Sequence, residues 1–144
     1  MNVSLVPVPN IDAIWPHIRV GLHDACLATG GDISTADLWV QCRSGSAFLI
    51  IAHETKHETM DIVGASIWRV DTWETGRRLR CLALYGKKAR QWIFDMRAMV
   101  DQLKADTGSI ALVAEGRCGP NGEPIWQHFF PKAKAIRVLY EEQL

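Results

Sequence analysis

Apolar residues recur at helical spacing in two long stretches of the chain. From residue 11 to residue 22 they fall at positions i, i+3, i+4, i+7 and i+11, which places them on one face of a helix. Pro16 lies within the first two turns, where proline is better tolerated than in a helix interior. Asn10 is placed to cap this helix, and Gly30 is placed to end it. Residues 89–106 repeat the pattern and predict a long amphipathic helix.

Short apolar runs rich in β-branched and aromatic residues predict strands. In one run, Leu79, Cys81 and Ala83 alternate with Arg78 and Arg80, so the two sets are expected on opposite faces of a sheet. The predicted strands cover residues 3–8, 47–52, 62–70, 77–84, 109–114 and 135–141.

Two shorter helices complete the pattern. Ser34 and Asp37 resemble a capping box with Asp in place of Glu, which predicts a helix through about Arg43. Residues 125–130 predict the other, after a loop rich in glycine and proline. The resulting order, β-α-α-β-β-β-α-β-α-β, predicts an α/β fold with a mixed central sheet and helices on both faces. Residues 1–144 contain no linker or repeat, which indicates a single domain.

Residues 53–59 read HETKHET, and the first five match the zinc-protease pattern H-E-x-x-H. Zinc binding by this pattern requires His53 and His57 to lie one turn apart on a helix. The stretch lies instead between two predicted strands, which indicates a hairpin loop. Lys56 would also be unfavourable in a buried active-site helix, and no later helix offers an obvious third ligand. The sequence therefore predicts no metal site.

Composition limits the location and the partners. The formal net charge is zero, so no overall field draws the chain to nucleic acid or to a membrane. No apolar run approaches the roughly 20 residues of a transmembrane helix, and the first ten residues do not resemble a signal peptide. We therefore expect a cytoplasmic protein. The four cysteines are widely spaced, which indicates reduced, mostly buried thiols. Exposure of Trp68 and Trp73 would favour homodimerisation or partner binding.

The order and spacing of several short motifs resemble the GNAT fold, which is the fold of the Gcn5-related N-acetyltransferases. Within that group the chain is most similar to small GNAT-like proteins encoded by tailed phages and prophages, which would place it in the host cytoplasm or the virion. The resemblance covers nearly the whole chain. The residues that carry it are Ile11, Trp15-Pro16, Gly30-Gly31-Asp32-Ile33, Ile62-Val63-Gly64-Ala65, Leu82-Ala83-Leu84-Tyr85-Gly86, Trp92, Glu115-Gly116-Arg117, Leu139-Tyr140-Glu141-Glu142 and Leu144.

This resemblance implies a site for acetyl-CoA where the fourth strand diverges from the fifth. Fourth-strand backbone would pair with the pantetheine arm of the cofactor. The loop that follows would bind the pyrophosphate, because a helix N-terminus offers unpaired N–H groups and the positive end of a dipole. The expected cofactor-binding residues are Leu82, Ala83, Leu84, Gly86, Lys87, Lys88, Ala89 and Arg90.

Six of the 16 basic residues lie in this strand and loop, which suits an anionic ligand: Arg77, Arg78, Arg80, Lys87, Lys88 and Arg90. The loop departs from the Q/R-x-x-G-x-G/A pattern of acetylating members, since it keeps only Gly86. A strand-to-helix turn with solvated charges is therefore an alternative. Together with Trp73 and Trp92 the same charges could contact nucleic acid, which the neutral net charge does not favour.

Acetyl transfer to an amine needs a base for the nucleophile and an acid for the leaving thiolate. The resemblance implies a glutamate on the central strands as base and a tyrosine in the last helix as acid. Glu115 is the candidate base, and its alternative role is an ion pair with Arg117. The last helix has His128 but no tyrosine, so His128 and Tyr85 are the candidate acids. A half-buried structural histidine is the alternative for His128.

Two functions remain open at this point. The first is an acyl-CoA-dependent N-acyltransferase that acts on an amine of a small molecule or a protein. The second is a GNAT-like phage protein without catalysis, which would bind a phage or host protein as a virion component or a host-interaction protein. The missing glycines and tyrosine favour the second function, and the basic loop favours the first.

Overall fold

The computed structural model describes residues 1–115, 129–137 and 139–144. The predicted order of elements is confirmed from the first strand to the fifth. The elements are β1 (Asn2–Leu5), η1 (Val8–Asn10), α1 (Ile11–Ala28), α2 (Thr35–Arg43), β2 (Phe48–Lys56), β3 (Thr59–Trp73), β4 (Gly76–Gly86), η2 (Ala89–Gln91), α3 (Ile93–Asp106) and β5 (Ala111–Ala114), where η marks a short 3-10 helix.

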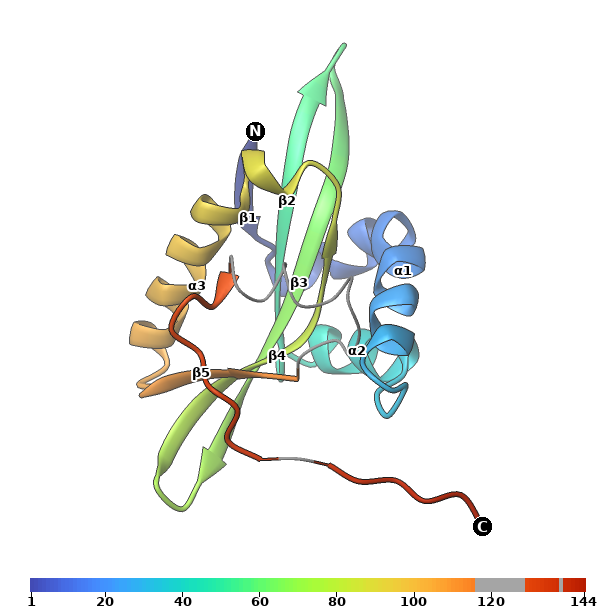
Figure 1. Cartoon of the computed structure of the whole chain (residues 1–144). Helices are drawn as coiled ribbons and strands as arrows, with labels where there is room; N and C mark the ends of the chain where they lie inside the picture. Colours follow the sequence, from blue (N-terminus) through green and yellow to red (C-terminus); the bar gives the residue numbers. More distant parts are fainter. Residues whose placement is uncertain (116–128, 138) are drawn as a thin grey trace.

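The described strands form one mixed sheet in the order β1-β2-β3-β4-β5. Neighbouring strands are antiparallel except β4 and β5, which are parallel. Helices α1 and α2 cover one face of the sheet and α3 covers the other (Figure 1). The predicted α/β fold with a mixed sheet is therefore confirmed. No helix in the described ranges is long and apolar enough to cross a membrane.

The core has two layers, one on each face of the sheet. Ile18 and Leu22 of α1 pack in the first layer, and Met96 and Val100 of α3 pack in the second. Trp68 is fully buried in the second layer, where it stacks on Phe129 with 5.9 Å between ring centroids. Its exposure to a partner, considered from the sequence, is therefore excluded. Three described cysteines are buried thiols, as predicted: Cys26, Cys42 and Cys81.

The HETKHET segment forms a hairpin, as predicted, but with a tighter turn. Strand pairing continues to Lys56 opposite Thr59, and only His57 and Glu58 form the turn, with φ of 50° and 66°. Positive φ at both turn residues matches the twist of a two-residue hairpin. His53 lies within β2, and its Nε2 is 2.9 Å from Ser4 Oγ. The segment therefore lacks the helix that zinc ligation by H-E-x-x-H requires.

The two N-terminal helices begin differently. The predicted capping box of α2 is confirmed, because the Asp37 backbone N–H donates to Ser34 Oγ at 3.1 Å and the Ser34 N–H donates to the Asp37 carboxylate. The prediction that Asn10 caps α1 is wrong. Helix η1 runs directly into α1, so Asn10 has helical backbone angles and its side chain accepts no capping bond.

The predicted last strand, residues 135–141, is wrong for the part that the structure describes. Residues 133–137 and 139–144 form no sheet pairing, and the segment extends away from the domain (Figure 1). An alternating sequence shows that a segment fits a strand, but the pattern does not supply a neighbouring strand. Of the predicted helix at 125–130 only Phe129 and Phe130 are described, and the preceding glycine-rich loop lies outside the described residues.

Candidate functional site

Strands β4 and β5 are paired along only half of β4. Their parallel pairing runs from Arg78 opposite Ala111 to Cys81 opposite Ala114. Strand β4 continues through residues 82–86 beyond this pairing. At about 3.3 Å per residue, this distal part of β4 spans roughly 17 Å. The described β5 ends at Ala114, so the divergence of the fourth and fifth strands stays a prediction.

A β-bulge lies where this distal part of β4 begins. Ala83 pairs with Ile67 and Cys81 pairs with Trp68, so Leu82 is an extra residue in β4. A bulge bends its strand and reverses the side-chain alternation beyond it. Leu82 and Ala83 therefore both pack in the α1 layer, whereas Leu79 and Cys81 pack in the α3 layer. The prediction that Ala83 shares a face with Leu79 and Cys81 is wrong for this reason.

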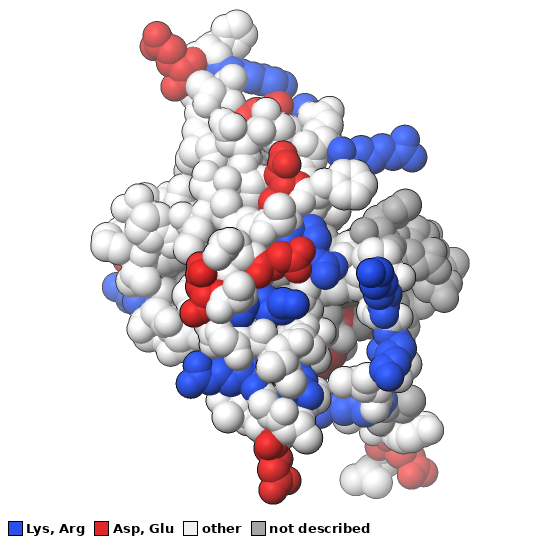
Figure 2. Space-filling view, turned by 90° about the vertical axis from the view of Figure 1, so that its left-hand side faces the viewer, with Lys and Arg blue, Asp and Glu red and all other residues white. Residues whose placement is uncertain are grey.

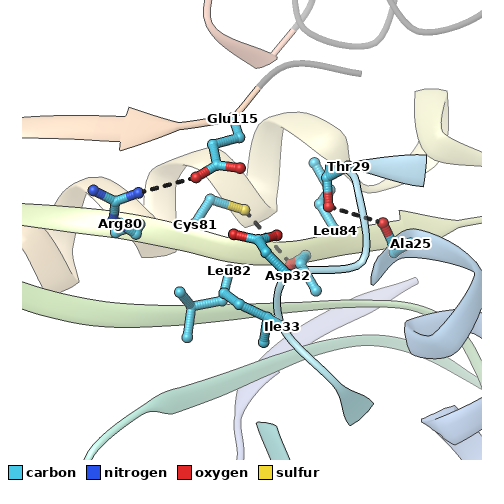
Figure 3. Close-up of a pocket in the computed structure, with 10 residues that line it drawn as sticks. Ala25, Thr29, Asp32, Ile33, Arg80, Cys81, Leu82, Leu84 and Glu115 are labelled. Carbon is cyan, nitrogen blue, oxygen red and sulfur yellow. Dashed lines mark hydrogen bonds and ion pairs between the residues drawn. The ribbon is translucent and has the colours of Figure 1, made fainter. Parts of the chain in front are cut away.

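Two hollows that share lining residues lie along the distal part of β4. A small cavity of about 30 Å³ lies at the bulge, where the end of α1, the α1–α2 connection and the end of β5 meet β4 (Figure 3). A larger cleft of about 640 Å³ lies between α1 and the β4–η2 loop. Both are lined by Ala25 and Leu84, so together they run along β4 from the loop to Glu115.

A glycine on α1 shapes the larger cleft. A Cβ at Gly21 would lie 2.2 Å from Tyr85 Cε2, so only glycine leaves room for this ring. The Tyr85 side chain thereby crosses from β4 to α1 and forms part of the cleft lining. Burial raises the pKa of Tyr85 to about 12, so the phenol stays protonated at neutral pH.

Trp92 fixes the loop that closes the other end of the cleft. Its indole packs over the paired glycines Gly64 and Gly86, where an added Cβ would lie 2.6 Å and 2.4 Å from Trp92 Cζ2. Its Nε1 donates to the Lys87 carbonyl at 2.7 Å, and the Lys87 N–H donates to the Val63 carbonyl at 2.7 Å. The loop is therefore held on the sheet before α3 begins.

This loop presents unpaired backbone donors. The N–H groups of Lys88, Ala89 and Arg90 donate to no described residue. Lys88 has φ of 55°, the left-handed region that glycine occupies most readily. A turn of free N–H groups at a helix start binds anions in many proteins. Among the described residues, the loop thus offers the backbone feature that the resemblance led us to expect.

The six basic residues do not gather at one place. Arg77 donates to the Thr107 carbonyl, and Arg78 lies over the Trp73 ring at the far end of β4. The strand between Arg77 and Gly86 spans about 30 Å. On the side that carries α3, acidic and basic side chains are interspersed (Figure 2). Arg77 and Arg78 therefore lie far from the loop, because residues near in sequence are separated along an extended strand.

Glu115 pairs with Arg80 in the structure. Arg80 Nη1 lies 3.4 Å from Glu115 Oε1, and Arg80 Nε donates to Asp71 at 2.6 Å (Figure 3 shows the Arg80–Glu115 contact). Burial favours a higher pKa for Asp71, but the hydrogen bonds from Arg69 and Arg80 lower its pKa below the usual range. The alternative partner considered for Glu115, Arg117, lies outside the described residues.

The predicted site residues fall into three groups. Leu82, Ala83, Leu84 and Glu115 line the small cavity, and Leu84, Tyr85, Gly86, Lys87 and Ala89 line the larger cleft. Lys88 and Arg90 line neither hollow, and His128 lies outside the described residues. Most of the candidate set thus lies along one continuous surface.

Sequence reasoning missed the contributions of α1 and of the α1–α2 connection. Thr29 and Asp32 line the small cavity with Glu115, and His17 and Asp24 line the larger cleft. The signal that could have located this side of the site was Gly21, because a glycine inside a helix often marks a close packing contact. The acidic residues carried no signal, since exposed carboxylates are common on helices.

Solved structures share this fold, whereas no protein-family model and no curated protein matches the sequence. An aminoglycoside acetyltransferase from an uncultured soil metagenomic sample superposes with a TM-score of 0.69 at 14% identity, over 99% of this chain and 97% of that chain. A GCN5-related N-acetyltransferase from Ralstonia eutropha JMP134 gives 0.67 at 14% identity, over 99% and 97%. A predicted acetyltransferase with acetyl-CoA from Clostridium acetobutylicum gives 0.62 at 13% identity, over 99% and 95%.

Identities this low establish the fold alone. The chain has the GNAT fold, and its structural neighbours are acetyltransferases of that type. Activity has to be argued from the site itself.

Proposed function

We propose that this protein is an acyl-CoA-dependent N-acyltransferase, with acetyl-CoA as the first cofactor to test. The observation that carries the proposal is the loop after β4, whose N–H groups at residues 88–90 donate to no described residue and which lies at one end of a cleft along β4. An extended cofactor arm could lie in this cleft with its phosphates at the loop. The two hollows together give the arm and the acyl group a place to lie.

The chain's own residues suggest an assignment for each end of the cofactor. The loop amides of Lys88, Ala89 and Arg90, with Lys87 nearby, would bind the pyrophosphate. The thioester would lie near Ala83, because this residue follows the Leu82 bulge and lines the small cavity. The acceptor amine would enter past the α1–α2 connection.

In the proposed reaction the amine nitrogen attacks the thioester carbonyl carbon. A C–N bond forms, the C–S bond breaks, and the acyl group moves from sulfur to nitrogen. Glu115 would take the proton that the amine loses, directly or through water. Tyr85 would donate a proton to the leaving thiolate, for which its raised pKa of about 12 keeps the hydroxyl available. His128 remains a second candidate for this proton.

The structural neighbours suggest a first class of acceptor amine to test. Aminoglycoside acetyltransferases are among the structural neighbours, and one was solved with sisomicin. Carboxylates that line the hollows, among them Asp24 and Asp32, would favour a cationic amine over a neutral or anionic acceptor. Sisomicin is therefore the first acceptor to test, and a protein amine is the alternative.

Calorimetric titration with acetyl-CoA tests the proposal directly. We expect a dissociation constant in the micromolar range for the unmodified protein. Lys87→Glu should weaken binding about tenfold or more, because it places a negative charge beside the phosphates; tenfold corresponds to about 1.4 kcal/mol. Arg77→Glu makes the same charge change at the far end of β4 and should leave affinity within about twofold.

Release of free thiol from acetyl-CoA with sisomicin then separates the two functions left open. Binding with turnover supports the enzyme. Binding without turnover over a panel of amines would favour a GNAT scaffold that has lost catalysis, as the loop's single glycine suggests for a phage-derived binding protein. Absence of acetyl-CoA binding by the folded protein would remove the cofactor site altogether.

A further inference from the structure

Glu54, the glutamate of the H-E-x-x-H motif, forms an ion pair with Lys88 of the proposed cofactor loop. Glu54 Oε1 lies 3.1 Å from Lys88 Nζ and 3.2 Å from Lys56 Nζ. These two hydrogen bonds, led by the one from Lys88, lower the pKa of the Glu54 carboxyl. The carboxylate is the better covered partner, with 17% of its side chain exposed against 45% for Lys88. Glu54 thus connects the β2–β3 hairpin to the loop after β4.

The contact directs the Lys88 side chain away from the two hollows along β4. Strand β3 lies between β2, which carries Glu54, and β4, which ends two residues before Lys88. The side chain must therefore pass β3 to reach Glu54, on the side of β4 opposite to β5. Consistent with this direction, Lys88 lines neither of the two hollows.

The backbone N–H of Lys88, unlike its side chain, has no partner among the described residues. Lys88 holds a left-handed conformation, with φ of 55°, and its N–H is among those without a described acceptor. Because Glu54 holds the Lys88 ammonium group, the loop offers backbone donors while this side-chain charge is engaged elsewhere. Lys87, which lines the larger cleft, has no ion-pair partner among the described residues.

We propose that Glu54 is a positioning residue for the anionic cofactor, which acts by holding Lys88 away from the loop amides and so sets the cofactor affinity. This inference rests on the proposed function, because it takes the loop to be the phosphate site. Loss of the Glu54 charge would release Lys88 to reach a bound phosphate, as a mobile ammonium group does readily. Glu54 therefore lowers CoA affinity in the unmodified protein.

Titration of the Glu54→Gln variant with CoA tests this role. We expect about fivefold tighter binding than in the unmodified protein, the scale of one exposed charge pair. The affinity should also fall more steeply with added salt, since one more ion contact is then made with the phosphates. Glu58→Gln is the matched control, because it removes the same charge at the hairpin turn, where Glu58 forms no described ion pair.

The Lys88→Gln variant separates an effect through Lys88 from direct repulsion by Glu54. If Glu54 acts through Lys88, the gain from Glu54→Gln should disappear in the Lys88→Gln background. If the gain persists in that background, the carboxylate repels the phosphates directly and the positioning role is wrong. Such a double-mutant cycle is valid provided each variant keeps the native fold, which thermal unfolding checks.

The outcomes also distinguish this inference from the proposed function. CoA binding to the unmodified protein with no change in Glu54→Gln overturns the inference and leaves the function standing. CoA binding that is detected for the Glu54→Gln variant but not for the unmodified protein supports both the inference and the proposed function. Absence of binding by every variant overturns the function, and the positioning role with it.

Discussion

Gly21 of α1 and Tyr85 of β4 are in direct contact, and the Tyr85 ring fits only because Gly21 has no side chain. The ring occupies the space where a side chain at position 21 would project, at 2.2 Å from an added Cβ. Glycine in a helix interior otherwise costs about 1 kcal/mol relative to alanine. Glycine at position 21 therefore lowers the stability of α1, but it allows the Tyr85 ring of β4 to lie against this helix.

This contact predicts that the effect of Gly21→Ala on stability depends on whether the Tyr85 ring is present. Gly21→Ala alone should destabilise the protein by about 1–3 kcal/mol, because the methyl group overlaps the Tyr85 ring. In a Tyr85→Ala background the same substitution should stabilise by up to about 1 kcal/mol, since only the helix-propensity gain remains. Urea unfolding of the four proteins measures both effects. Destabilisation of equal size in both backgrounds would show that the ring is not what excludes a side chain at position 21.

Sequence reasoning could propose Tyr85 and the loop residues as candidates, but it could not predict the directions of their side chains. Lys87 and Lys88 are adjacent and chemically identical, yet one lines the cleft and the other pairs with Glu54. Their separation depends on a left-handed backbone at Lys88, for which a non-glycine sequence carries no clear signal. Contacts between residues 34 positions apart in the chain are likewise set by the fold.

At the scale of elements, strands β3 and β4 are joined by a charge network as well as by backbone pairing. Asp71 of β3 accepts from Arg69 at 2.8 Å and from Arg80 of β4 at 2.6 Å, and Arg80 continues to Glu115 after β5. Only 14% of the Arg80 side chain and 17% of the Asp71 side chain are exposed. This network links β3, β4 and the end of β5 at the point where the pairing of β4 with β5 ends.

Asp71→Asn should therefore destabilise the protein by about 2 kcal/mol at pH 7, through loss of charged hydrogen bonds to two arginines. Because the pKa of Asp71 is lowered in the folded state, its contribution is present above the unfolded pKa of about 3.9 and is lost as pH falls through the folded value. The difference in unfolding free energy between Asp71→Asn and the unmodified protein should therefore become smaller below about pH 4. Urea midpoints at pH 7 and pH 3 measure this change.

Asp101→Asn is the matched control for that experiment. Asp101 pairs with Arg97 within α3, but 48% of its side chain is exposed. Exposed pairs of this kind contribute less than about 1 kcal/mol. An equal loss in both variants would argue that burial of the Asp71 network does not set its strength.

The elements themselves were largely predictable, because their patterns are local. The apolar face of α1, the Ser34 capping box and the alternation of the first half of β4 all appear in the structure. The Leu82 bulge was not predicted, since an extra residue in one strand is defined only by the strand opposite. The side of the sheet on which Ala83 packs depends on that bulge, and the prediction for Ala83 failed with it.

At the scale of the whole molecule, the C-terminal segment differs from the rest. The side chains of Ile136, Leu139 and Tyr140 are exposed, although their sequence is typical of a strand. The contacts of the segment with the described domain are few, such as Arg137 at 5.9 Å from the Trp73 ring. The strand predicted here is wrong for the described residues, because an alternating pattern forms a strand only where a free strand edge is in reach.

Limited proteolysis with trypsin tests this arrangement. We expect cleavage first after Lys132, Lys134 and Arg137, all of which are exposed and outside sheet pairing. The remaining domain should keep its melting temperature within about 2 °C, since the lost segment buries little surface. Sites on α3 such as Lys104 provide an internal comparison and should resist. Protection of all three tail sites would mean that the segment is docked on a sheet in solution.

Trp92 gives the molecule an optical property that follows from its packing. Its indole is buried over Gly64 and Gly86, and its ring N–H is bonded to the carbonyl of Lys87 in the proposed cofactor loop. A change in this loop alters the polarity and hydrogen bonding around a natural fluorophore. The emission of Trp92, isolated as the difference between the spectra of the unmodified protein and a Trp92→Phe variant, therefore reports on the loop without any attached dye.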